Sequence, residues 1–172
     1  MIYKFTPHGV GRPFGFLGHP TEGFALAFDS AGNLFAADAV GGTIYKFAPD
    51  GTQSVFIGPQ AFGDLGDPIG LAFDYFDNLF VSVFNGVETF AGILKFTPSG
   101  VKTTFAMDLD NPRGLAFDSA GNLFVAEIPF PGSGDILKFT PDGTRTVFAS
   151  GIGDPEGNSG PEFLAIQPGI SP

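Results

Sequence analysis

Short apolar runs alternate with polar turns along the whole chain. The runs are only a few residues long and are bounded by Gly, Pro, Asp and Asn, which is the pattern of β-strands joined by tight turns. No segment keeps the helical period of about 3.6 residues, because Gly and Pro recur too often to sustain it. The pattern therefore predicts an all-β protein with almost no helix.

The strands recur in a fixed order of four. Gly-Leu-Ala-Phe-Asp occurs at 70–74 and 114–118, and related segments lie at 24–29 and 164–167. Each of the three complete copies continues with Asn-Leu-Phe, then a Lys-Phe segment, and then a further Phe nine residues later. Successive complete copies are 45 and 44 residues apart. This period with four short strands is typical of a β-propeller blade, whose strands we name a to d.

The repeat divides a single domain, residues 1–172, into blades. We predict strands c and d of a partial blade in 1–17, full four-stranded antiparallel blades in 24–57, 69–106 and 114–149, and the first strand of a further blade in 163–167. These fifteen strands are one fewer than the sixteen of a closed four-bladed ring. We therefore interpret the chain as a piece of a larger propeller. An imperfect closing blade and a homodimer that closes the ring through the chain ends are the alternatives.

The repeat also explains most of the aromatic residues and half of the basic ones. Of the 22 Phe residues, fourteen occupy repeat positions, so we expect them to pack blade against blade rather than to form a platform for bases or sugars. The basic residues of strand c are expected to lie over the apolar surface of a neighbouring blade; they are Lys4, Lys46, Lys95 and Lys138.

Loop lengths differ between the two faces of the predicted propeller. The Phe residues of strands a and b are seven apart in every copy, and those of strands c and d are nine apart. From b to c the spacing is 12, 16 and 15 residues, and from d to the next a it is 14, 17, 12 and 18. Because antiparallel strands alternate in direction, the variable b-to-c and d-to-a loops share one face. Variable loops on one face of a repeat protein usually mark its binding face.

Polar side chains at the strand ends of this variable-loop face are the candidate binding residues. They are Glu22, Asp38, Asp67, Ser82, Asn111, Arg113, Glu127 and Glu162. Carboxylates that converge on a propeller axis suit a hard cation such as Ca²⁺. Capping of loop backbone is the alternative role for each of them. One divalent cation on the axis is the single cofactor that the sequence leaves open.

Composition narrows the classes of partner and reaction. The net charge of −10 and the pI near 4.3 argue against nucleic acid and anionic membranes as partners. No apolar run is long enough for a membrane span. With no Cys, a thiolate site is excluded, and the two His residues without a Gly-x-Ser-x-Gly motif give little support to a serine triad. The expected partner is a protein or a small molecule held on the variable-loop face.

The segments Pro-Arg-Gly-Leu-Ala-Phe-Asp-Ser-Ala-Gly-Asn-Leu-Phe-Val-Ala-Glu at 112–127 and Ile-Leu-Lys-Phe-Thr-Pro-Asp-Gly at 136–143 resemble the NHL-repeat β-propellers. The broader superfamily includes gluconolactonase and regucalcin-like lactone hydrolases. The resemblance implies a propeller that is commonly six-bladed and that mostly serves binding or scaffolding. The C-terminal strand followed by Gly-Ile-Ser-Pro also resembles the point where exported bacterial NHL-like proteins pass into a sorting tail, which implies an exported bacterial protein.

The lactonase relatives bind one divalent cation on the axis through a Glu, an Asn and an Asp. Glu22 and Asn111 resemble the first two ligands, but the usual Asn-Gly-Leu order is here Asn-Pro-Arg-Gly-Leu, which displaces Asn111 and adds Arg113. The leading hypothesis is therefore a non-catalytic binding or scaffold module. The alternatives are a metal-dependent lactonase-like hydrolase and an architectural repeat of an exported surface protein.

Overall fold

The computed structural model describes residues 1–17, 23–63, 66–84, 91–129, 132–153 and 160–167. Within these residues the protein is all-β apart from one short 3-10 helix, η1 (Pro59–Ala61). No helix in the described ranges is long and apolar enough to cross a membrane.

The strands form three four-stranded antiparallel sheets of consecutive strands and one two-stranded sheet. The two-stranded sheet consists of β1 (Ile2–Phe5) and β2 (Gly11–Gly15). The first four-stranded sheet consists of β3 (Gly23–Phe28), β4 (Leu34–Asp38), β5 (Thr43–Phe47) and β6 (Gln53–Ile57). The second sheet consists of β7 (Asp67–Phe73), β8 (Leu79–Phe84), β9 (Ala91–Phe96) and β10 (Lys102–Met107). The third consists of β11 (Pro112–Phe117), β12 (Leu123–Glu127), β13 (Gly134–Phe139) and β14 (Arg145–Ile152).

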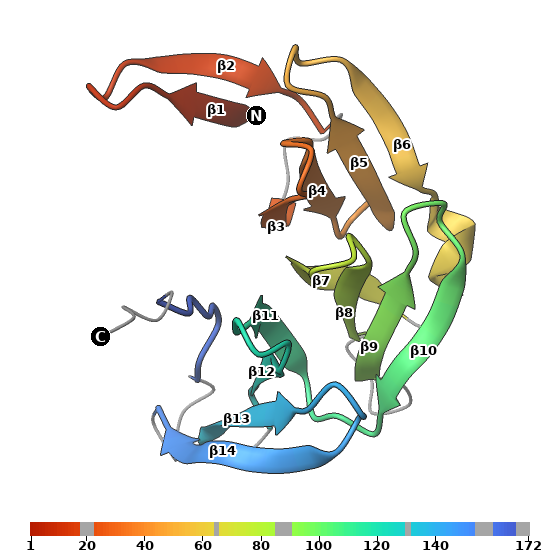
Figure 1. Cartoon of the computed structure of the whole chain (residues 1–172), viewed down its shortest axis with the longest axis vertical. Helices are drawn as coiled ribbons and strands as arrows, with labels where there is room; N and C mark the ends of the chain where they lie inside the picture. The colour runs from red at the N-terminus through yellow and green to blue at the C-terminus, as the bar shows by residue number, and fades with distance from the viewer. Residues whose placement is uncertain (18–22, 64–65, 85–90, 130–131, 154–159, 168–172) are drawn as a thin grey trace.

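The sheets stand side by side along an arc, with β3, β7 and β11 on the inner side and β6, β10 and β14 on the outer side (Figure 1). The inner strands of neighbouring sheets contact one another around a common axis. This arrangement is a partial β-propeller, so the all-β class and the four-stranded antiparallel blades that the repeat predicted are confirmed.

The segment after β14 continues the inner row without forming a strand. Gly114 of β11 donates its backbone N–H to the carbonyl oxygen of Glu162 at 3.0 Å. A Cβ on Gly114 would lie 2.9 Å from the Cα of Phe163, which shows how closely the two segments approach. Within the described residues no strand pairs with 163–167. Its assignment to a further blade therefore stays a prediction.

Repeat phenylalanines join each blade to the next one. The Phe35 ring of β4 lies 5.0 Å from Phe56 of β6 and 4.8 Å from Phe73 of the following blade, centroid to centroid. In the next blade, Phe80 makes the same contacts with Phe105 and Phe117, both at 5.0 Å. These edge-to-face groups lie in two apolar clusters, each built from two adjacent sheets. The predicted blade-to-blade packing is confirmed at these positions.

The strand-c lysines lie over aromatic rings of their own blade, not over the neighbouring blade as expected. Lys46 of β5 lies 5.3 Å above Phe35 of β4, and Lys95 of β9 lies 5.1 Å above Phe80 of β8. The antiparallel register explains the difference, because it places each lysine directly opposite that phenylalanine. The pairing combines a cation–π contact with cover for the ring.

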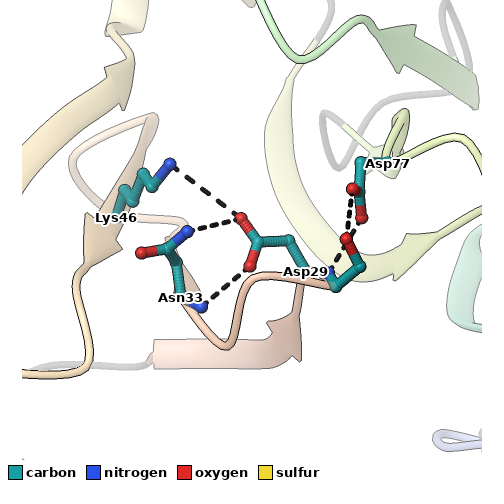
Figure 2. Close-up of polar contacts among 5 residues, drawn as sticks. Asp29, Asn33, Lys46 and Asp77 are labelled. Carbon is teal, nitrogen blue, oxygen red and sulfur yellow. Dashed lines mark hydrogen bonds and ion pairs between the residues drawn. The ribbon is translucent and has the colours of Figure 1, made fainter.

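The tight a-to-b turns that the sequence predicts are held by hydrogen bonds to aspartate side chains. Asp29 accepts hydrogen bonds from the backbone N–H and the side-chain Nδ2 of Asn33, at 2.8 and 2.7 Å, and lies 3.9 Å from Lys46 Nζ (Figure 2). The carboxylate of Asp77, in the next blade, accepts hydrogen bonds from the backbone N–H and the hydroxyl of Ser30, at 2.9 and 2.5 Å (Figure 2). The second pair of bonds links the turns of two neighbouring blades.

Replacing one of the shared phenylalanines should destabilise the whole fold. Phe80 is 3% exposed and is part of the packing between two blades, whereas Phe28, a repeat phenylalanine of strand a, is 66% exposed. Phe80→Ala is expected to lower the free energy of unfolding by about 3–5 kcal/mol, because it leaves a cavity between the sheets. Phe28→Ala should change it by less than about 1 kcal/mol. Urea unfolding followed by circular dichroism measures both, and equal effects would contradict the packing scheme.

Candidate functional site

Arg113 is the central cation of the variable-loop face. It lies near the beginning of β11, where the inner strand starts. Its guanidinium carbon lies 6.0 Å from the centroid of the Phe84 ring, and its Nε lies 4.0 Å from Oε2 of Glu162. The Nε atom is buried and has no hydrogen-bond partner among the described residues. The side chain of Arg113 is thus held between a ring and a carboxylate while Glu162 extends into solvent.

Asp67 adds a second carboxylate to this group. It is the first residue of β7 and lies opposite Phe84 in the ladder between β7 and β8. Partial burial raises the pKa of Asp67 above its ordinary value. The structure therefore brings three of the predicted residues, Asp67, Arg113 and Glu162, to the ends of neighbouring inner segments. We name Asp67, Phe84, Arg113 and Glu162 the axial group.

A small cavity of about 140 Å³ lies on the axis beside the axial group. Its walls are the inner strands β3, β7 and β11 together with residues 162–164, and Glu162 is the one charged residue among those that line it. The cavity is larger than a few water molecules require but smaller than the pocket of a typical drug-sized ligand, about 300 Å³ or more. A ligand of this face would therefore rest on the loops and insert only a small group.

Ser82 is buried between two blades and does not face a ligand. Its hydroxyl accepts a hydrogen bond from the Gly70 N–H and donates one to the carbonyl oxygen of Arg113, both at 2.7 Å. A Cβ on Gly70 would lie 2.2 Å from that carbonyl oxygen, so only glycine fits there. Ser82 thus fixes the distance between β7 and β11, and through Arg113 it positions the axial group.

Asp38 and Glu127 hold loop backbone, the capping role that the sequence left open. Asp38, the last residue of β4, accepts a hydrogen bond from the Gly41 N–H at 3.0 Å. Glu127, the last residue of β12, accepts one from the Asp110 N–H at 2.8 Å. Both side chains are buried. Burial raises the pKa of Glu127 above its ordinary value, even though the hydrogen bond to Asp110 acts in the opposite direction.

The described residues do not complete the divalent-metal site implied by the lactonase resemblance. The site stays a prediction, because Glu22, one of its two predicted ligands, lies outside the described residues. Asn111, at φ +52°, donates its Nδ2 to the Ile128 carbonyl at 3.1 Å, and its buried Oδ1 has no hydrogen-bond partner there. Across the described ranges no three His, Cys, Asp or Glu side chains are grouped closely enough to bind a metal ion.

The sequence analysis missed an acidic cavity beside the third blade. The cavity measures about 340 Å³, and its charged lining residues are Asp108, Asp110, Glu127, Asp135 and Arg145. Arg145 Nη1 donates to the carbonyl oxygen of Asp108 at 3.2 Å, which ties β14 to the loop of the preceding blade. The closely spaced Asp108 and Asp110 were the signal in the sequence, but Asp135 and Arg145 come from a different hairpin and only the fold brings them there.

The structure also exposes two aromatic residues on the opposite face. Tyr75 and Phe76 lie at the tip of the turn between β7 and β8, on the face of the short turns. The matching turns of the other two complete blades carry Ser-Ala-Gly where this one has Tyr-Phe-Asp. That departure from the repeat was a readable signal, although the sequence analysis treated the aromatic residues as packing.

Removing the Ser82 hydroxyl tests the contact between β7 and β11. Ser82→Ala leaves the Gly70 N–H and the Arg113 carbonyl without their buried partner, so the free energy of unfolding should fall by about 1–3 kcal/mol. Thr103→Ala is the control, because Thr103 is exposed and the hydrogen bond that its hydroxyl donates to the Lys95 carbonyl is long, at 3.4 Å. Urea unfolding gives both values, and a neutral Ser82→Ala would contradict the assigned role.

Glu127 should make stability depend on pH. Because burial raises its pKa in the folded state, the folded protein holds this proton more tightly than the unfolded chain. The contribution of Glu127 to stability therefore falls as pH rises from its unfolded pKa through the raised folded pKa. Glu127→Gln keeps an oxygen for the Asp110 N–H and removes the charge. We expect a higher free energy of unfolding than wild type at pH 7 and no gain at pH 4. A variant less stable at pH 7 would contradict this.

Several solved structures share this architecture. Virginiamycin B lyase from Staphylococcus aureus matches with a TM-score of 0.65 and 18% identity, over 88% of this chain and 49% of that chain. A protein assigned as a gluconolactonase matches with a TM-score of 0.63 and 16% identity, over 86% of this chain and 55% of the other. A chain of the nidogen/laminin complex matches with a TM-score of 0.69 and 19% identity, over 84% and 54%. The present chain thus spans about half the length of these structures.

No protein-family model matches the sequence, and no curated protein is significantly similar to it. Identities of 16–19% establish a shared fold and leave the activity open. The expected likeness to NHL and gluconolactonase-like propellers therefore holds at the level of the fold. The chain is a partial β-propeller of four-stranded blades, with the blade architecture of the virginiamycin B lyase, the gluconolactonase and the nidogen/laminin complex.

Proposed function

We propose that this chain is a non-catalytic binding module that holds a positively charged partner on its variable-loop face. The observation that carries the proposal is the difference in loop length between the two faces. Turns on one face repeat with constant spacing, whereas the loops on the other differ in length from blade to blade. Constant turns serve folding, and variable loops are free to serve recognition.

Charge on the variable-loop face supports a cationic partner. The exposed carboxylates among its described residues are Asp67, Asp108, Asp110 and Glu162. Two cations lie near these carboxylates: Arg113, which is beside Glu162 and over Phe84, and Arg145, which donates to the carbonyl oxygen of Asp108. On the opposite face, the strand-c residues Lys46 and Lys95 form ion pairs with the turn residues Asp29 and Asp74. The field of the variable-loop face is therefore negative, which attracts a basic segment and speeds its encounter.

The residues that could have supported catalysis on this face are used in the fold. The Ser82 hydroxyl joins two blades, and the buried Asp38 and Glu127 hold loops. Among the similar structures, the nidogen/laminin complex contains a propeller together with a protein partner. This precedent for the fold favours a protein segment as the ligand.

A metal-dependent lactonase-like hydrolase is the second candidate. The observations in its favour are the buried Oδ1 of Asn111, which has no hydrogen-bond partner among the described residues, and the shared fold with a gluconolactonase. Metal analysis of the purified chain together with a lactone-hydrolysis assay separates the two candidates. A bound divalent ion with turnover that is lost in Asn111→Ala would replace the binding proposal.

The remaining expectations also stay proposals. An architectural repeat of an exported surface protein would bind no probe on either face. A homodimer that closes the ring would cover apolar side chains that are exposed on the first and last sheets of the arc, such as Phe5 of β1 and Phe148 of β14.

Two matched charge variants test the binding proposal. The first, Asp110→Asn with Glu162→Gln, removes two carboxylates from the variable-loop face. The second, Asp50→Asn with Asp142→Asn, removes two from the turn face and keeps an oxygen for the turn hydrogen bonds to Thr52 and Thr144. Both change the net charge equally. Titration calorimetry with an acetylated octalysine peptide should show about fivefold weaker binding for the first variant and less than about twofold for the second.

Added salt should weaken the binding of the octalysine peptide to wild type, because the contact is electrostatic. An octaglutamate peptide of the same length should not bind. Equal losses for the two charge variants would show that only net charge matters and would overturn the assignment of the variable-loop face.

A further inference from the structure

The turn between β7 and β8 exposes an aromatic pair that the fold does not need. Tyr75 is 95% exposed and Phe76 is 76% exposed, and their ring centroids lie 5.8 Å apart at an interplanar angle of 82°. The equivalent positions in the other two complete blades are Ser-Ala, at 30–31 and 119–120. Because those turns form with small residues, the aromatic pair has no structural role in this one. Adjacent exposed aromatic side chains are a feature of interaction surfaces.

Hydrogen bonds order the backbone of the turn that carries this pair. Oδ1 of Asp74 accepts hydrogen bonds from the N–H groups of Phe76 and Asn78 at 2.9 and 2.8 Å, and its Oδ2 accepts one from Asn78 Nδ2 at 2.8 Å. Lys95 lies 3.6 Å from the same Oδ2. A partner would therefore meet a turn that is already ordered, and binding would cost little conformational entropy.

Asp77 stands beside the pair in a backbone conformation that favours glycine. Its φ is +58°, whereas Gly32 and Gly121 occupy the matching positions at +79° and +81°. The two hydrogen bonds from Ser30 hold the Asp77 carboxylate in place across the blade boundary (Figure 2). These bonds lower the pKa of Asp77, so the carboxylate is charged at neutral pH. The charge of Asp77 is thus held at the turn face beside the two rings, in the position where the other turns have an uncharged glycine.

Local charge identifies the chemistry of the partner. The two nearby lysines are already engaged, since Lys95 pairs with Asp74 and Lys46 pairs with Asp29. Asp77 is the third carboxylate at these turns, and the three carboxylates with the two lysines have a net charge of −1. A cationic side chain can stack on an aromatic ring and approach a carboxylate at the same time, and arginine does both best because its guanidinium is planar.

We propose that Tyr75, Phe76 and Asp77 form a second docking surface, which binds an arginine side chain of a partner protein. The guanidinium stacks on one of the rings and donates to the carboxylate of Asp77. This surface lies on the face opposite the variable loops, so it does not depend on the binding proposed there. A phosphate-bearing ligand is disfavoured by the charge of −10, and the two rings are too steeply inclined to form one flat platform for a sugar.

The test is a nuclear magnetic resonance titration of the whole chain with an acetylated, amidated peptide of four Gly-Arg repeats. The ring resonances of Tyr75 and Phe76 should shift and saturate with wild type. The double variant Tyr75→Ser with Phe76→Ala lacks these rings, so its affinity and that of wild type are compared through the backbone amide resonances of Asp74 and Asn78 in the same turn. The affinity should fall about fivefold in the variant, as expected for loss of an exposed cation–π contact of about 1 kcal/mol. This variant has the same Ser-Ala pair as the equivalent turns of the other two complete blades, so we expect it to fold.

Three controls make the outcome specific. Asp77→Gly restores the residue of the matching turns and should weaken binding without unfolding the turn. Tyr3→Ser removes an exposed aromatic residue from β1 and should leave the affinity unchanged. The variable-loop variant Asp110→Asn with Glu162→Gln should also leave the Tyr75 and Phe76 shifts unchanged, which separates this proposal from the proposed function.

The proposal is overturned by any of three results. The first is an absence of saturable shifts at Tyr75 and Phe76 in wild type. The second is an unchanged affinity in the Tyr75→Ser with Phe76→Ala variant. The third is equal binding of a matched peptide of four Gly-Glu repeats, which would show that the rings bind any flexible peptide.

Discussion

Packing of one sheet against the next is the interaction on which this structure depends. Each blade is apolar on both faces, so no blade buries its own surface, and each is stabilised by its neighbour. The ring of Phe73 lies against Phe35 of the preceding blade, and Phe117 repeats the contact against Phe80. Because the same phenylalanine serves two sheets, the blades are held at a constant spacing along the arc.

That constant spacing decides where polar chemistry can lie. At the inner strands the backbones approach so closely that Gly70 admits no side chain and Ser82 bonds to both neighbouring strands. The Ser82 hydroxyl, a polar group in this region, therefore forms hydrogen bonds between blades and does not face solvent. Side chains at the strand ends remain available, and they divide between Arg113 with its surrounding carboxylates on one face and the charged turns on the other.

Departures from the repeat carry the functional information. Asp38 and Glu127 occupy the same position of two blades, where the middle blade has Val83, and both hold loops. Arg113 and Tyr75 have no counterpart in the other blades. A residue that recurs in every blade is explained by packing or by turn geometry. A residue that replaces a recurring one and that neither packing nor turn geometry explains, such as the exposed Tyr75, points to recognition.

The sequence by itself determined the local elements, because strand periodicity, turn chemistry and the repeat of Phe and Asn are properties of neighbouring residues. The blades and the Asp29 to Asn33 turn bonds could be predicted for that reason. Only the tertiary structure decided that Ser82 is a link between blades, that Lys46 covers Phe35 of its own blade, and that Asp135 and Arg145 join Asp108 around one cavity. Those contacts depend on the register of paired strands and on the spacing between sheets, and neither is encoded in the order of residues along a single strand.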